Sequence, residues 1–196
     1  PGTDDLVILQ DGLDGYAGTS DTFLDSYHST FPKGSKQWLN SRDDKSKPLV
    51  RFNIFANEGG PVPEGSTISY AALAVYKYSH YNYTYRAHPL LIDWVESTAT
   101  WIQAADGIPW NEPSAAGNGT DYATTGSPDR YTDWEPGWVV LNVTDAVQSM
   151  SLGQLNNYGW QMIGAGPNYQ KAFRSREYAA AAIADLSETE GLAGFL

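Results

Sequence analysis

The apolar residues of this chain come in short runs, each ended within a few residues by glycine, proline, asparagine, aspartate or serine. Residues 48–55 show the pattern best, because Val50, Phe52 and Ile54 occupy every second position. A period of two is typical of a half-buried β-strand. Runs this short leave no room for long amphipathic helices or for alternating strands and helices. The chain is therefore predicted to be all-β.

The same reading predicts about eight to ten short strands. They are residues 6–10, 22–25, 37–40, 48–55, 68–79, 83–91, 138–142, 158–164 and 170–175. Short helical turns are predicted at residues 92–96 and 145–150, the second N-capped by Thr144. Residues 104–135 are rich in glycine, proline and aspartate and are predicted to form long polar surface loops. This order of elements predicts an antiparallel β-sandwich of the jelly-roll type.

A chain of 196 residues is the right length for one such domain. We expect the sandwich to occupy residues 1–178. Residues 179–196 contain a run of alanines and no alternation, so their propensity is helical or irregular. They are predicted to form an atypical tail in the place of a last strand.

Composition and charge exclude several classes of function. The chain has no cysteine, which excludes disulfides, thiolate zinc sites and thiol nucleophiles. Its net charge of −11 disfavours nucleic-acid binding, which needs clustered lysine and arginine. No apolar run is long enough for membrane insertion. Three glycosylation sequons, at Asn82, Asn118 and Asn142, favour export, so an extracellular or cell-surface location is predicted.

A series of phrases in this sequence resembles the DNRLRE-type domain, which is related to the disaggregatase-associated domain and to a carbohydrate-binding module family. The phrases, in order, are LQDGLDGYAGTSDTFLDS, PLVRFNI, PEGSTISYAALAVYKYS, DWVESTATW, IPWNEP, WVVLNVTDAVQSM, NNYGWQMIGAG and FRSREYA. They span residues 6–179. The resemblance implies a jelly-roll sandwich attached to extracellular enzymes and surface proteins. Some members bind acidic polysaccharides such as alginate.

The end of the chain departs from that family. In similar domains the chain continues after the FRSREY phrase into a hydrophobic last strand, whereas residues 179–196 stand in its place here. We therefore expect an unpaired sheet edge, which is a template for a strand from another chain. The donor would be residues 1–10, whose LVILQ run is short and apolar, or the C-terminal tail.

Aromatic residues supply the best candidate ligand surface. A tyrosine stripe follows residues 76–85 and consists of Tyr76, Tyr78, Tyr81, Tyr83 and Tyr85. Aromatic faces stack on sugar rings, and Lys77 or Arg86 could pair with uronate carboxylates. The same tyrosines would also suit the core and rim of a sandwich, and both interpretations stay open. Trp94, Trp101 and Trp110 are interpreted as core and loop anchors.

Two arginines in the FRSREY phrase extend this candidate surface. Arg174 and Arg176 offer bidentate contacts to the carboxylates of an anionic sugar. The alternative is that an arginine pairs internally with Glu177 and locks the last strand in place.

The turn-rich stretch near the N-terminus suggests a metal site. Asp11, Asp14 and Asp21, with Asp25 beside them, offer the carboxylates and glycine-rich turns that calcium prefers. Their spacing is not that of an EF-hand loop. The alternative is that these aspartates cap turns and strands.

We expect the chain not to be an enzyme. Its three histidines, His28, His80 and His88, are scattered, and no nucleophile-elbow motif occurs. Asp93 and Glu96 flank Trp94, but neighbouring carboxylates are common in so acidic a chain. The function predicted is a non-catalytic carbohydrate-binding or adhesive surface module. The alternative is a structural subunit that binds copies of itself and forms a filament or sheet by strand exchange.

Overall fold

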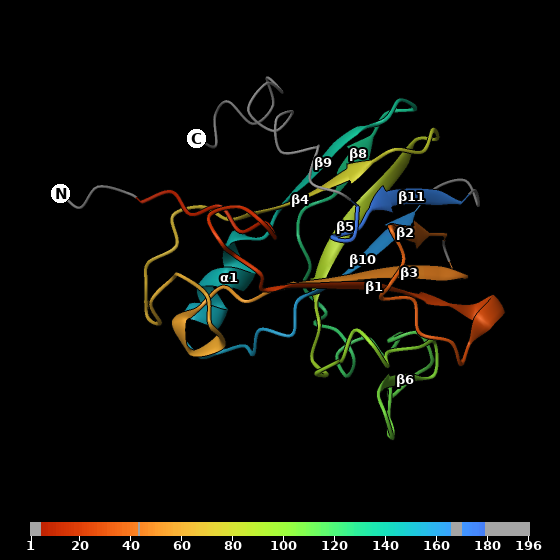
Figure 1. Cartoon of the computed structure of the whole chain (residues 1–196), viewed down its shortest axis with the longest axis horizontal. Coiled ribbons are helices and arrows are strands. Elements are labelled where there is room, and N and C mark those ends of the chain that lie inside the picture. Colours follow the sequence, from red (N-terminus) through yellow and green to blue (C-terminus); the bar gives the residue numbers. More distant parts are fainter. Residues whose placement is uncertain (1–4, 43, 166–169, 179–196) are drawn as a thin grey trace.

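The computed structural model describes residues 5–42, 44–165 and 170–178. Strands dominate, joined by loops and by a few short helical segments (Figure 1). The elements are β1 (Thr19–Asp25), η1 (Ser26–His28), β2 (Trp38–Ser41), β3 (Ser46–Phe52), η2 (Ala56–Glu58), β4 (Ala72–Lys77), β5 (Tyr83–Pro89), β6 (Gln103–Ala105), β7 (Ile108–Pro109), β8 (Arg130–Thr132), β9 (Gly137–Asn142), α1 (Thr144–Ser151), β10 (Trp160–Ala165) and β11 (Lys171–Arg174).

The strands form two principal antiparallel sheets. The first has five strands in the order β1-β3-β10-β5-β8, and the second has four in the order β2-β11-β4-β9. Strands β1 to β5 alternate between these two sheets, and so do β8 to β11. The small pair β6-β7 stands by itself between β5 and β8, which pair with each other in the five-stranded sheet. Alternation of this kind is the jelly-roll arrangement. The prediction of an all-β sandwich is confirmed.

The main core lies between the sheets and follows from alternation along each strand. In β4, Leu73, Val75 and Lys77 point inward and are buried, whereas Tyr76 lies on the outer face. From the opposite sheet, Tyr83 and Tyr85 of β5 fill the same space. The pairing of Phe173 with both Leu39 and Lys77 places β11 between β2 and β4.

A second core covers the outer face of the five-stranded sheet. Leu24 and Leu49 of that sheet pack against Trp94 and Trp110 from the long connection between β5 and β8. Trp94 is completely buried, and its indole nitrogen donates a hydrogen bond of 2.8 Å to the carbonyl of Tyr158. Residues 104–135 are predicted to form polar surface loops, and this is wrong in part, because Trp110 and Ala115 are buried in the second core. The connection between β5 and β8 forms a packed cap that lies below β1 and β3 in Figure 1.

Three other local predictions need comment. Residues 6–10 form no strand, and Leu6, Val7 and Ile8 are 56%, 43% and 47% exposed. Residues 92–96 form no helix. The last described strand, β11, is paired on both sides rather than lying at an open edge. The predicted tail, residues 179–196, lies outside the described residues.

The predicted helix near residue 145 is present as α1, but its N-cap is Val143 rather than Thr144. The hydroxyl of Thr144 instead accepts a hydrogen bond of 3.0 Å from the amide of Ala71, before β4. Within the described residues, no helix combines the length and the apolar character that a membrane span requires.

Candidate functional site

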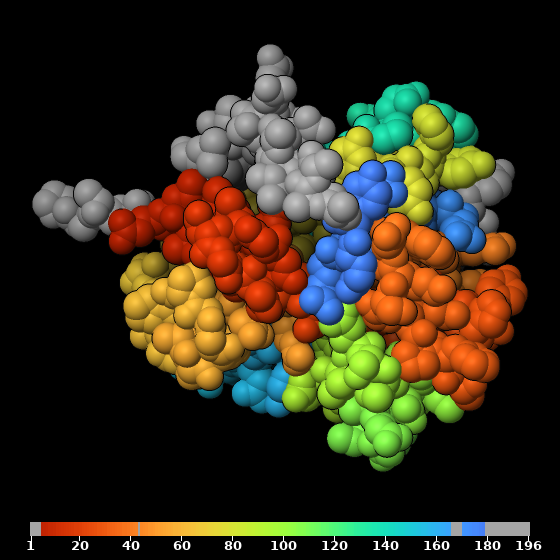
Figure 2. Space-filling view, viewed as in Figure 1, coloured from red at the N-terminus to blue at the C-terminus, as the bar shows by residue number. Residues whose placement is uncertain are grey.

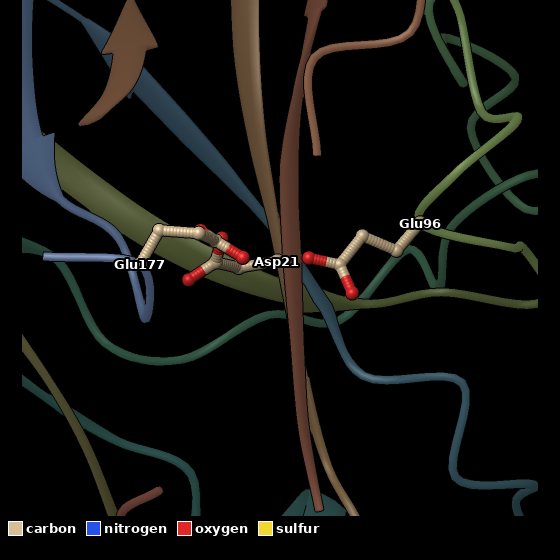
Figure 3. Close-up of side chains that lie close together, drawn as sticks. All are labelled: Asp21, Glu96 and Glu177. Atoms are coloured by element: carbon tan, nitrogen blue, oxygen red, sulfur yellow. The ribbon is translucent and has the colours of Figure 1, made fainter. Parts of the chain in front are cut away.

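Three carboxylates from distant parts of the sequence meet at the β1 edge of the sandwich. They are Asp21 in β1, Glu96 in the loop after β5 and Glu177 just after β11, and together they form the acidic cluster (Figure 3). Figure 2 shows the blue end of the described chain between the red N-terminal residues and the orange residues, with the green loop below. One oxygen from each carboxylate lies within 4.8 Å of the other two.

Asp21 is the innermost member and is only 4% exposed. Its Oδ2 accepts a hydrogen bond of 2.7 Å from the main-chain amide of Arg176. Its Oδ1 has no partner among the described residues, nor does the buried Oε2 of Glu177. Buried carboxylate oxygens without partners are unusual, because the desolvation cost is not offset.

Arg176 is the cation of this site. Its guanidinium contacts both oxygens of Glu96 at 3.0 Å each, Oε1 of Glu177 at 3.0 Å and Oδ2 of Asp11 at 3.4 Å. The internal arginine–glutamate pair, which was the alternative to sugar recognition for Arg176, is therefore present. One guanidinium faces four carboxylates when Asp21 is included.

Burial and the excess of negative charge change the pKa values of the carboxylates in this cluster. Burial raises the pKa of Asp21 to about 8, and the charges of Glu177 and Glu96 add to the effect against the hydrogen bond from Arg176. Burial also raises the pKa of Glu96, although its contact with Arg176 opposes this. Without a further cation, the cluster therefore favours a bound proton on Asp21.

The structure assembles only part of the predicted metal set of Asp11, Asp14 and Asp21. Asp11 reaches the cluster through Arg176, and its other oxygen accepts a hydrogen bond of 2.9 Å from the amide of Thr19. Asp14 is exposed in a turn with φ of 49° and does not join the cluster. Asp25 caps η1 through the amide of Tyr27 and contacts His28, as the turn-capping alternative predicts.

A second candidate site is the outer face of the four-stranded sheet, where aromatic and basic side chains lie across neighbouring strands. We call it the stacked face, and it consists of Trp38 in β2, Arg174 in β11, Tyr76 in β4, Tyr78 just after β4, and Trp138 in β9. Arg174 lies 4.1 Å from the ring centre of Tyr78 and 3.7 Å from that of Tyr178. The rings of Tyr76 and Trp138 meet edge-to-face at 5.3 Å.

The other members of the tyrosine stripe do not share this face. Tyr83 and Tyr85 are buried in the main core, so their rings cannot form an exposed platform. Tyr81 lies in the loop between β4 and β5, edge-on to Trp134 at 4.8 Å. The interpretation of the stripe as a continuous sugar platform is therefore corrected, because alternation along β5 turns part of it inward.

Two basic residues proposed to accompany the stripe are also elsewhere. Lys77 is buried, and its ammonium donates hydrogen bonds of 2.9 Å and 2.6 Å to the carbonyls of Tyr81 and Asp133. Arg86 belongs to β5 in the other sheet, where it contacts Asp129 at 2.8 Å. Lys77 and Arg86 therefore do not belong to the stacked face.

The remaining predicted residues are dispersed. Asn118 and Asn142 are exposed, whereas Asn82 is half-buried and donates to the hydroxyl of Tyr131. Asp93 and Glu96, although close in sequence, pair with different arginines, Arg51 and Arg176.

Sequence reasoning missed Glu96 and Glu177 as partners of Asp21. Both lie within the phrases that carry the family resemblance, DWVESTATW and FRSREYA. Spacing along the chain gave no other signal, since the three carboxylates come together only through the packing of the sheets.

No protein-family model matches this chain, and a search of curated proteins found no match. The resemblance to the DNRLRE-type domain stays a prediction.

Proposed function

We propose that this chain is a non-catalytic, extracellular surface module that binds an acidic polysaccharide on the stacked face. The observation that carries the proposal is the position of Arg174, which lies over the rings of Tyr78 and Tyr178 on the outside of a β-sheet. Stacking engages the face of a guanidinium, whereas its N–H donors lie in the plane and suit the two oxygens of a carboxylate.

An exposed aromatic ring and a second cation lie near Arg174 and would also contact the sugar. Trp38 is 38% exposed and lies beside Arg174 in the register of β2 and β11. Lys36 places a second cation 5.6 Å from the Trp38 ring centre. Exposed aromatic faces next to cations would hold the sugar ring by stacking and the uronate by charge. A sheet face suits a linear polymer, since several residues of the polymer would contact neighbouring strands.

Affinity electrophoresis of the full chain in gels that contain alginate, polygalacturonate or a neutral glucan tests the proposal. We expect the two uronate polymers to retard the wild type and the neutral glucan not to. Arg174→Gln should weaken retardation at least tenfold. Arg86→Gln is the matched control, because it removes the same charge from the other sheet, and it should bind as the wild type does. Equal loss in both variants, or no retardation of the wild type, would contradict the proposal.

A second function is favoured by one separate observation. Leu6, Val7 and Ile8 form an exposed apolar run outside both sheets, which leads away from the sandwich in Figure 1. Such a run could pair with an edge strand of another copy, and head-to-tail contacts of this kind propagate into filaments. In this case the chain would be a structural subunit of an extracellular filament or sheet.

Electron microscopy of the full chain at high concentration distinguishes the two functions. A subunit that exchanges strands should form filaments, and the Val7→Asp variant should remain as single particles. Discrete particles of the wild type under all conditions would exclude the assembly function and leave polysaccharide binding unaffected.

A further inference from the structure

The acidic cluster has features that neither polysaccharide binding nor the packing of the sandwich requires. It joins three segments: the edge strand β1 through Asp21, the loop after β5 through Glu96, and the residues after β11 through Glu177 (Figure 3). One oxygen from each carboxylate lies within 4.8 Å of the other two. Ligands of one calcium ion, bound at about 2.3–2.6 Å, span distances of this size.

Proximity alone does not make a site, since acidic groups often gather on surfaces. The second observation is the pair of orphaned oxygens. Asp21 is 96% buried, as its 4% exposure implies, and its Oδ1 has no hydrogen-bond partner among the described residues. Oε2 of Glu177 is buried and equally without a partner there. Two such oxygens in one buried cluster are stabilised either by a proton or by a cation between them.

The charged groups already present in the cluster do not supply this cation. Arg176 contacts Glu96, Glu177 and Asp11 through its guanidinium, and it reaches Asp21 only through its main-chain amide. Within the described part of the chain, the single guanidinium of Arg176 therefore stands against four carboxylates. The orphaned oxygens belong to Asp21, which Arg176 contacts through its main-chain amide, and to Glu177, which the guanidinium contacts at Oε1.

We propose that Asp21 and Glu177, with Glu96 as a third ligand, bind a calcium ion that fastens the segment after β11 to the edge strand β1. The donors are all carboxylate oxygens, which suit a hard cation and not the metals that prefer sulfur or imidazole. Calcium tolerates an irregular ligand set, whereas magnesium requires near-octahedral geometry at shorter distances. The site differs from the one predicted from sequence, since Glu96 and Glu177 replace Asp11 and Asp14 beside Asp21.

Isothermal titration of the full chain, after treatment with EDTA, tests this inference with calcium chloride and magnesium chloride as the probes. We expect the wild type to bind calcium at one site, with magnesium at least tenfold weaker. Calcium should also raise the thermal unfolding temperature. Asp21→Asn and Glu177→Gln should each weaken calcium binding at least tenfold. Asp14→Asn is the matched control and should bind as the wild type does.

Hydrogen exchange of the wild type gives a readout that does not depend on the variants folding. Calcium should slow amide exchange in peptides that cover residues 170–178 and 92–98, and leave the turn around Asp14 unchanged. Absence of calcium binding by the wild type at millimolar concentration would overturn the proposal and indicate a shared proton between Asp21 and Glu177. Protection confined to the turn around Asp14 would also overturn it and restore the site predicted from sequence.

Discussion

The main-chain amide of Arg176 donates a hydrogen bond of 2.7 Å to the carboxylate of Asp21, which joins the end of the described chain to its first strand. Asp21 lies in β1, at the edge of the five-stranded sheet, and Arg176 follows β11, in the four-stranded sheet. The bond therefore closes one side of the sandwich. It also brings Glu177 and the side chain of Arg176 against the residues that surround Asp21.

Removing the Arg176 charge should destabilise the protein. Its guanidinium pairs with Glu96, Glu177 and Asp11, and its loss leaves these carboxylates facing one another. Because the Arg176 side chain is 35% exposed, we discount the cost of breaking a buried pair to about 1–2 kcal/mol for Arg176→Gln. Urea unfolding with EDTA present measures this.

Arg86→Gln serves as the control for that measurement. The pair between Arg86 and Asp129 has both side chains about half-exposed, at 45% and 60%, so its loss should cost between about 0 and 1 kcal/mol. Equal losses of unfolding free energy in Arg176→Gln and Arg86→Gln would mean that the acidic cluster contributes no more to stability than an exposed ion pair.

The cap between β5 and β8 should be part of the cooperative fold. Trp94 is fully buried against Leu49 and Leu90, so Trp94→Ala should cost about 3–5 kcal/mol through lost burial and the cavity left behind. The matched variant is Trp134→Ala, whose indole is 53% exposed and which should cost about 0.5 kcal/mol or less. Chemical unfolding followed by circular dichroism compares the two. An independent early transition in Trp94→Ala would show that the cap unfolds separately.

Substitution by alanine should have different effects on stability at two glycines that lie in strands. A Cβ at Gly164 in β10 would overlap the ring of Tyr83 in the core, whereas a Cβ at Gly137 in β9 meets nothing within 4 Å. Gly164→Ala should therefore cost about 1–3 kcal/mol by overpacking. Gly137→Ala should be neutral or slightly stabilising, since it restricts the unfolded chain. Thermal unfolding distinguishes them, and an unchanged Gly164→Ala would place the Tyr83 ring elsewhere.

His88 should titrate at a lower pH than an ordinary histidine. Burial lowers its pKa from 6.5, with a smaller contribution from Arg86, against the hydrogen bond to the carbonyl of Ala123. A histidine whose pKa is lower when folded binds fewer protons in the native state than in the unfolded state. Its contribution to stability is therefore fully present above pH 6.5 and is lost as the pH falls toward the folded pKa.

Nuclear magnetic resonance of the imidazole protons measures that pKa directly. The chain has only three histidines, so His88→Gln identifies the His88 signal by its disappearance. A midpoint at or above 6.5 would contradict the burial seen in the fold.

The phrase FRSREY shows which features of the candidate sites could be predicted from the sequence and which could not. It correctly suggested that one arginine would pair with Glu177, and Arg176 does so. It could not divide the two arginines between roles, because they have the same chemistry and differ in position: Arg174 ends β11 over Tyr78, whereas Arg176 follows β11 beside Asp21. Glu96 was considered only with its neighbour Asp93, because its proximity to Asp21 arises from the packing of the loop after β5 against β1.

The all-β class, the alternating strand within residues 48–55 and the short helix α1 follow from the sequence alone. These features are local, since side-chain alternation and helix propensity depend on neighbouring residues. Tertiary packing alone sets the cap between β5 and β8 and brings Asp21, Glu96 and Glu177 together. Those contacts depend on which strands pair and how the loops cross the sheets, and no period along the chain encodes that pairing.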